Sequence, residues 1–196
     1  MIVLSSISAS RRRLLTQCGV PYKTAKPGFE EGPARAAMKN AGASAADVAA
    51  ALAEGKANSI AEILPGAHVI GADQMLECGG SWFDKPADRA AARAHLQALR
   101  GKTHTLITAA VIAYEGRTVW RHAETARMTM RDFSDGFLDH YLDRAGDGVI
   151  RSVGAYELEG AGAQLFDKIE GDFFAILGLP LIPLLAGLRE SGALPR

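Results

Sequence analysis

An unbroken apolar run, VIGA at positions 69–72, leads into Asp73 and constrains the fold more than any other feature of this chain. Pro65 and Gly66 interrupt the helical pattern before it, so a β-strand can begin at His68. Because the run shows no polar alternation, it is typical of a strand that is covered on both faces in the middle of a sheet. The sequence therefore predicts an α/β protein in which Asp73 stands at the end of a buried strand.

Patterns on both sides of this strand predict further helices and strands. Serine caps, helical periodicity and glycine stops mark the helices, and β-rich runs mark the strands. The expected elements are a strand at 1–6, a helix ending before residue 19, a capped helix at 45–63, an amphipathic helix at 87–100, a hairpin turning at 115–116 and a helix starting at 134. We expect an exposed connection at 21–32 and short β segments with glycine turns at 153–185.

The charge balance excludes several classes of function. Lys plus Arg equals Asp plus Glu at 22 each, so no net basic field would recruit nucleic acid or an anionic membrane. No segment resembles a signal peptide or approaches the ~20 apolar residues of a membrane span. Cys18 and Cys78 form no CxxC pair and are expected to be buried thiols. We therefore expect a cytoplasmic protein of one domain or two small interdependent lobes.

Three turns rich in glycine or serine stand beside charged side chains and could hold an anion. They are residues 5–13 (SSISASRRR), residues 71–74 (GADQ) and residues 159–162 (EGAG). Backbone N–H groups can approach phosphate in such turns, and a helix N-terminus behind one adds partial positive charge. The first turn fits phosphate best, although three consecutive arginines cannot share one helix face and at least one must be solvated.

Other readings of these residues stay open at this point. Asp73 is either the former of an Asx turn or a working carboxylate, and Glu30 and Glu31 could be ordinary loop charges. The five histidines show no metal-ligand spacing, and His104 beside a β run is expected to be structural. No GxSxG or GxxxxGK[ST] motif occurs, which argues against an α/β-hydrolase or a P-loop enzyme.

Taken together and in order, seven further segments and the opening loop resemble the Maf-type nucleoside triphosphate pyrophosphatases. The opening loop SSISASRRRLLTQCG is followed by GFEEG, EGKA, VIGADQ, FDKP, LRGKTHTLITA, VGAYELEG and GDFFAILGLPL. The resemblance implies one Maf-like domain over residues 1–196, with a mixed elongated sheet and flanking helices that form two lobes around a cleft. It also implies a homodimer.

The resemblance further implies hydrolysis of a nucleoside triphosphate to the monophosphate and pyrophosphate, in nucleotide-pool house-cleaning. A divalent cation, Mg²⁺ or Mn²⁺, would be the cofactor. The substrate would be the triphosphate rather than a polynucleotide, with no membrane partner.

Positions that match the family's motifs receive roles in the same way. Asp73 matches the catalytic carboxylate and a metal ligand, and Glu31 is the second candidate for the metal. The triphosphate would be held by four residues: Ser6, Arg11, Lys56 and Lys85.

Three positions would govern the choice of base. Members that act on dTTP and UTP tend to read SPRR, GADT and an Ile-Gln-Gly turn, whereas this chain has Ser10, Gln74 and Glu159 there. Gln74 and Glu159 resemble the branch associated with 7-methyl-GTP, since a carboxylate could accept hydrogen bonds from a methylated guanine. Ser10 departs from that branch, which tends to carry a large aromatic at this position.

Two rival hypotheses remain. One is a pyrophosphatase of the ITP type, which the order of the motifs disfavours. The other is a nucleotide-binding regulator of septation without catalysis. Pure binding would not require a carboxylate beside polyanionic phosphate, so Asp73 together with Lys56 and Lys85 argues against it.

Overall fold

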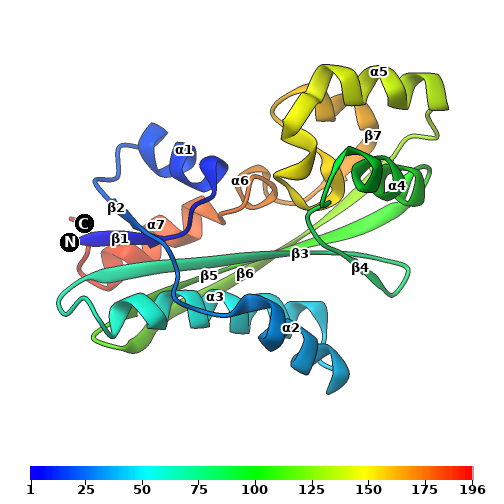
Figure 1. Ribbon diagram of the computed structural model, residues 1–196. Helices are drawn as coiled ribbons and strands as arrows, with labels where there is room; N and C mark the ends of the chain where they lie inside the picture. The colour runs from blue at the N-terminus through cyan, green and yellow to red at the C-terminus, as the bar shows by residue number, and fades with distance from the viewer. Residues whose placement is uncertain (196) are drawn as a thin grey trace. The chain divides into compact units, whose positions relative to one another are not determined.

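The computed structural model describes residues 1–195 and has the mixed α/β architecture that the sequence predicts (Figure 1). Its strands are β1 (Ile2–Ser5), β2 (Lys23–Ala25), β3 (His68–Cys78), β4 (Ser81–Phe83), β5 (Thr103–Tyr114), β6 (Arg117–Met130) and β7 (Phe166–Glu170). Its α-helices are α1 (Ala9–Gln17), α2 (Glu31–Asn40), α3 (Ala45–Ala61), α4 (Arg89–Leu99), α5 (Asp135–Ala145), α6 (Phe173–Ile176) and α7 (Leu181–Glu190). Three short 3-10 helices, η1 (Gly146–Ile150), η2 (Val153–Ala155) and η3 (Ala161–Leu165), follow α5.

The seven strands form a mixed sheet. Its hydrogen-bonded order is β2-β1-β3-β5-β6-β7, and β4 pairs with β3 off this path. Strand β1 is parallel to both β2 and β3, whereas the β3–β4 and β6–β7 pairs are antiparallel.

The chain divides into two compact units. Of the described residues, the first comprises 1–74, 107–124 and 172–195, and the second comprises 75–106 and 125–171. Strands β3, β5 and β6 each contribute residues to both units.

In the first unit, β1 and β3 send alternate side chains to opposite faces, as the pleat of a strand requires. Leu4, Ile70 and Ala72 join a buried cluster with leucines of α1 and α7. On the other face, Gly71 approaches the backbone of α3, which lies along β3 in Figure 1. Helix α3 begins with a capping box between Ser44 and Asp47, as the sequence predicts.

The second unit is built around α4 and α5. Arg89 pairs with Asp143 and Arg93 with Asp139, which joins these two helices on their solvent side. In the same unit His104, 1% exposed, makes a hydrogen bond of 2.8 Å between its Nε2 and the hydroxyl of Tyr156. This histidine is part of the packed interior of the unit.

Several predictions are confirmed, and the caps explain why. Ser8, Ser44, Asp88 and Ser134 each accept a hydrogen bond from the backbone at a helix start. The hairpin turns at residues 115–116, where both residues have positive φ. The amphipathic helix at 87–100 is α4, which spans Arg89–Leu99.

Other predictions are wrong. Asp73 lies inside β3 rather than at its end, because β3 continues to Cys78 and pairs there with β4. The connection at 21–32 has no buried residue, as predicted, but it contains the unpredicted strand β2, since Lys23–Ala25 extend the parallel sheet beside β1. The expected β segments at 153–185 are mostly 3-10 and α-helix, because the apolar end packs as α7 on the core. Cys18 is exposed and Cys78 half-buried, and both are free thiols rather than buried ones.

No helix within residues 1–195 is both long and apolar enough to cross a membrane.

Candidate active site

Three of the side chains singled out in the sequence meet in the first unit. The ammonium Nζ of Lys56 lies 2.6 Å from Oδ1 of Asp73 and 2.8 Å from Oε2 of Glu31. The side chains of Lys56 and Asp73 are 7% and 6% exposed, whereas that of Glu31 is 41% exposed. The lysine therefore joins one buried and one accessible carboxylate.

Gly71 explains why α3 brings Lys56 to Asp73. A Cβ at Gly71 would lie 2.1 Å from the carbonyl oxygen of Ala53 and 2.7 Å from the backbone nitrogen of Ala57. No other residue allows β3 and α3 to approach this closely. Asp73 points to the same face as Gly71, because residues two apart on a strand share a face.

Packing against α3 also places Glu31. A Cβ at Gly55, the residue before Lys56, would lie 2.7 Å from the ring of Phe29, so that ring rests directly on the helix backbone. Two residues later Glu31 begins α2 and reaches Lys56. The hydroxyl of Ser5 on β1 donates to the backbone oxygen of Lys56 at 2.7 Å and fixes the helix from the other side.

Arg11 ties the opening loop to β3. Its Nε donates to the carbonyl oxygen of Gly178 at 2.9 Å, and its Nη1 donates to that of Ala72 at 2.8 Å and to Oγ of Ser6 at 3.3 Å. Burial lowers the pKa of Arg11, and the charges of Asp73 and Glu31 oppose that change, so the guanidinium keeps its proton. These bonds leave Nη2 as the nitrogen that Arg11 can offer to phosphate.

Ser6 and Ser10 lie on either side of the start of α1. Ser6 is buried and accepts a hydrogen bond from the backbone nitrogen of Ser8, while Ser10 is half-buried in the first turn. Arg12 and Arg13 are exposed, which confirms that the three arginines do not share one face.

Gln74 faces away from Asp73, because consecutive strand residues point to opposite faces. Its Nε2 lies 2.8 Å from Oγ1 of Thr108 and 3.1 Å from the carbonyl oxygens of Ala175 and Ile176 in α6. Since Nε2 carries two hydrogens, these acceptors occupy both of them. Gln74 can then meet a ligand only through Oε1.

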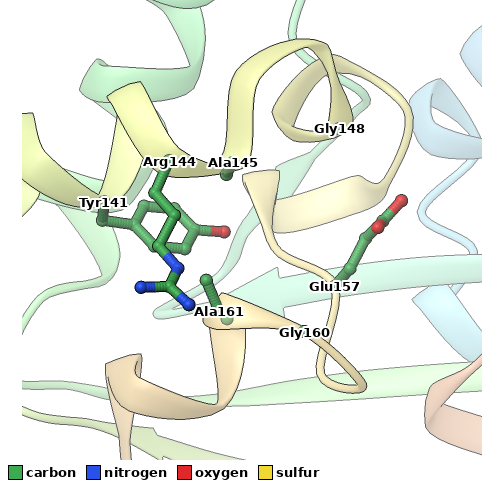
Figure 2. A pocket seen from close by; sticks show the side chains of 8 residues that line it. Tyr141, Arg144, Ala145, Gly148, Glu157, Gly160 and Ala161 are labelled. Atoms are coloured by element: carbon green, nitrogen blue, oxygen red, sulfur yellow. The ribbon is translucent and has the colours of Figure 1, made fainter.

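Lys85 and Glu159 belong to the second unit, where both are exposed. Lys85 follows β4, and Glu159 precedes Gly160, which lines a cavity of about 250 Å³. Figure 2 shows Tyr141 and Arg144 of α5 beside this cavity, with Glu157 on its far side. The Tyr141 hydroxyl donates to the carbonyl oxygen of Ala155, and burial, with the charge of Glu157, raises its pKa above the usual range.

The carboxylates of the first unit fit a divalent cation in part. Oδ2 of Asp73 is buried without a hydrogen-bond partner, which leaves one acceptor of this carboxylate unused. Carboxylate oxygens suit Mg²⁺, which takes one or two of them together with substrate phosphates. Within residues 1–195, however, no group of three or more His, Cys, Asp or Glu side chains gathers as a metal site.

Four contributors to the site were not predicted from the sequence. Thr108, which holds Gln74, lies in a continuous β run and carries no signal of its own. The carbonyl groups of Ala72 and Gly178, which hold Arg11, are backbone atoms that no pattern distinguishes. Gly71 did carry a signal, since an isolated glycine in a strand indicates close approach of another backbone.

Comparison with known proteins gives a consistent result. Residues 1–191 match the family described as Maf-like protein. The chain is 53% identical over 192 residues to the nucleoside triphosphate pyrophosphatase of Paramagnetospirillum magneticum, covering 98% of this chain and 99% of that protein. It is 50% identical over 190 residues to the 7-methyl-GTP pyrophosphatase of Brucella abortus, covering 97% and 96%.

Proposed function

Because the chain belongs to the Maf-like protein family, we propose that it is a nucleoside triphosphate pyrophosphatase. The substrate would be cleaved between the α- and β-phosphates to give the nucleoside monophosphate and pyrophosphate, which removes modified nucleotides from the pool. The observation that carries this proposal is the contact of Lys56 with both Asp73 and Glu31. Relatives named for this activity align over nearly the whole chain.

We propose that Asp73 accepts the proton of the attacking water. The buried carboxylate retains Oδ2 as a free acceptor, and a water bonded there would be oriented toward the α-phosphorus. Attack of this water forms the new P–O bond to the monophosphate, and the bond to the bridging oxygen breaks with release of pyrophosphate. A divalent cation would neutralise negative charge on the phosphates as that bond breaks.

The cationic groups would hold the triphosphate. Lys56 and Arg11 both lie in the first unit, and the Ser6 hydroxyl hydrogen can donate to an anion because its oxygen accepts from Arg11 and Ser8. Lys85 of the second unit is proposed for the same role on the strength of the family resemblance alone. Mg²⁺ or Mn²⁺ is proposed as the cofactor, held by Asp73 and Glu31.

For the base, we propose a preference for 7-methyl-GTP over dTTP and UTP. Gln74 has its amide nitrogen held by Thr108 and α6, so Oε1 would face a donor on the base. Glu159 directly precedes Gly160 in the chain, and its exposed carboxylate would likewise accept a hydrogen bond from the base. Ser10 would make only a small contact. The homodimer and the cytoplasmic location also remain predictions.

The proposal is tested by measuring pyrophosphate and monophosphate from 7-methyl-GTP, dTTP, UTP, CTP and ITP with Mg²⁺ or Mn²⁺. We expect release of pyrophosphate that is lost in Asp73→Asn. A wild-type protein that binds these nucleotides but releases no pyrophosphate would favour the regulator of septation instead.

A further inference from the structure

Lys56 occupies the position in which a cation would bridge Asp73 and Glu31. Its Nζ lies 2.6 Å from Oδ1 of Asp73 and 2.8 Å from Oε2 of Glu31, and its side chain is 7% exposed. Oxygen ligands approach Mg²⁺ at roughly 2.0–2.1 Å, so an ion shared by the same two oxygens would need the space that Nζ fills. The ammonium and the ion therefore exclude each other.

We propose that Lys56 prevents free divalent cations from binding between Glu31 and Asp73, and that a cation binds to these two carboxylates only together with a phosphate chain. The first half concerns the nucleotide-free protein alone. The second half rests on the proposed function, because it takes a nucleoside triphosphate as the source of the phosphates.

Charge explains why a free ion cannot displace Lys56 from the two carboxylates. Lys56 and Arg11 together balance Asp73 and Glu31, and the charges of both carboxylates act on Arg11 as well. If an aqueous ion displaced Lys56, the buried ammonium would lose both of its partners, which is strongly unfavourable. A phosphate chain supplies new anionic oxygens for the ammonium, so the exchange becomes favourable only when both ligands arrive together.

The ligand count supports the same order of binding. Within residues 1–195 no third His, Cys, Asp or Glu side chain joins Asp73 and Glu31 to complete a metal site. Mg²⁺ held by one or two carboxylates normally completes its shell with water and substrate phosphates. Oδ2 of Asp73, buried without a hydrogen-bond partner, is the acceptor that remains beside the lysine.

The test measures binding of Mn²⁺ by the full chain through its effect on water-proton relaxation, which distinguishes protein-bound ions from ions on free nucleotide. Wild type, Lys56→Met and Lys56→Arg are titrated with Mn²⁺ alone, and wild type is titrated again with a triphosphate analogue that carries a methylene bridge between the α- and β-phosphorus. Lys23→Met is the matched control, because Lys23 is an exposed lysine of the same unit.

We expect wild type, Lys56→Arg and Lys23→Met to bind Mn²⁺ weakly without nucleotide. Lys56→Met should bind it at least tenfold more tightly, and this gain should vanish when Asp73→Asn is added. Wild type should gain a protein-bound ion when the analogue is present.

The proposal is overturned if nucleotide-free wild type binds Mn²⁺ as tightly as it does with the analogue. It is also overturned if folded Lys56→Met shows no gain over wild type. Should Lys56→Met fail to fold, the two titrations of wild type still decide the matter. None of these measurements depends on turnover. If the protein releases no pyrophosphate, the proposed function is refuted, whereas the part of this proposal that concerns the nucleotide-free protein is still tested by the Mn²⁺ titrations.

Discussion

Lys56 of α3 and Asp73 of β3, which are 17 positions apart in sequence, form a buried ion pair in which Nζ and Oδ1 are 2.6 Å apart. Helix α3 can bring the lysine this close because Gly71 has no side chain to hold β3 away. Stability and the candidate chemistry therefore depend on the same contact.

Removing one partner of this pair should destabilise the protein. Lys56→Met leaves Asp73 charged, buried and unpaired, so we expect a loss of about 3 kcal/mol in the free energy of unfolding. Adding Asp73→Asn should recover part of that loss, because no unpaired charge then remains. Chemical denaturation of both single variants and the double variant measures the coupling. Additive effects would contradict a direct ion pair, and Lys23→Met is the exposed control.

Gly71→Ala should separate β3 from α3. The added Cβ would meet backbone atoms of Ala53 and Ala57, which cannot move without shifting the helix, so we expect a loss of roughly 1–3 kcal/mol in unfolding free energy. Pyrophosphate release should fall as well, because Lys56 moves with the helix. The control is Gly28→Ala, since a Cβ at Gly28 meets nothing within 4 Å. Equal stability of the two variants would show that the close approach is not required.

Acid should destabilise the second unit through His104. Burial lowers its pKa to about 4, and its Nδ1 has no partner for a second proton while Nε2 bonds to Tyr156. The unfolded chain binds that proton near pH 6.5, so stability is full above that pH and falls as the pH drops toward 4. The contribution lost between pH 7 and pH 4 is about 3 kcal/mol.

This pH effect is measured by comparing wild type with His104→Gln. The variant should be less stable at pH 7, yet it should lose less stability between pH 7 and pH 4 because it lacks the titrating ring. Parallel pH profiles for the two proteins would contradict the assignment to His104.

Gln74→Glu should be destabilising although it preserves size. The amide nitrogen of Gln74 donates to Thr108 and to carbonyl oxygens of α6. A carboxylate has no hydrogen to donate, so its oxygen would lie against these acceptor oxygens without a hydrogen bond. We expect a loss of about 1–3 kcal/mol in unfolding free energy. Gln164→Glu is the exposed control and should have little effect. A Gln74→Glu protein as stable as wild type would mean that these hydrogen bonds contribute little.

The sequence predicts the elements well where local chemistry decides them. Ser44 with Asp47 and the glycine at 116 determine a helix start and a hairpin turn within a few residues, so pattern alone suffices. The sequence pattern puts Asp73 wrongly at a strand end, because a glycine such as Gly71 is also typical of a turn. β3 continues beyond Asp73 to Cys78 because it pairs there with β4, and the residues of β4 follow a later turn.

The sequence predicts which residues form the candidate site but not how they are arranged. Asp73, Lys56 and Glu31 were singled out from motifs, whereas their shared contact requires the approach of α3 to β3 and of Phe29 to Gly55. Arg11 shows the limit more clearly, since its partners are carbonyl oxygens 61 and 167 positions away. Backbone acceptors at that separation leave no trace in a single sequence.

Hydrolysis in water enriched in ¹⁸O tests the central claim most directly, with the fastest nucleoside triphosphate of the panel as substrate and Asp73→Asn as the matched variant. If Asp73 directs water to the α-phosphorus, the label appears in the nucleoside monophosphate, none appears in pyrophosphate, and the rate falls at least about 100-fold in the variant. Label in pyrophosphate, release of orthophosphate as the first product, or an unchanged rate in Asp73→Asn would contradict the account.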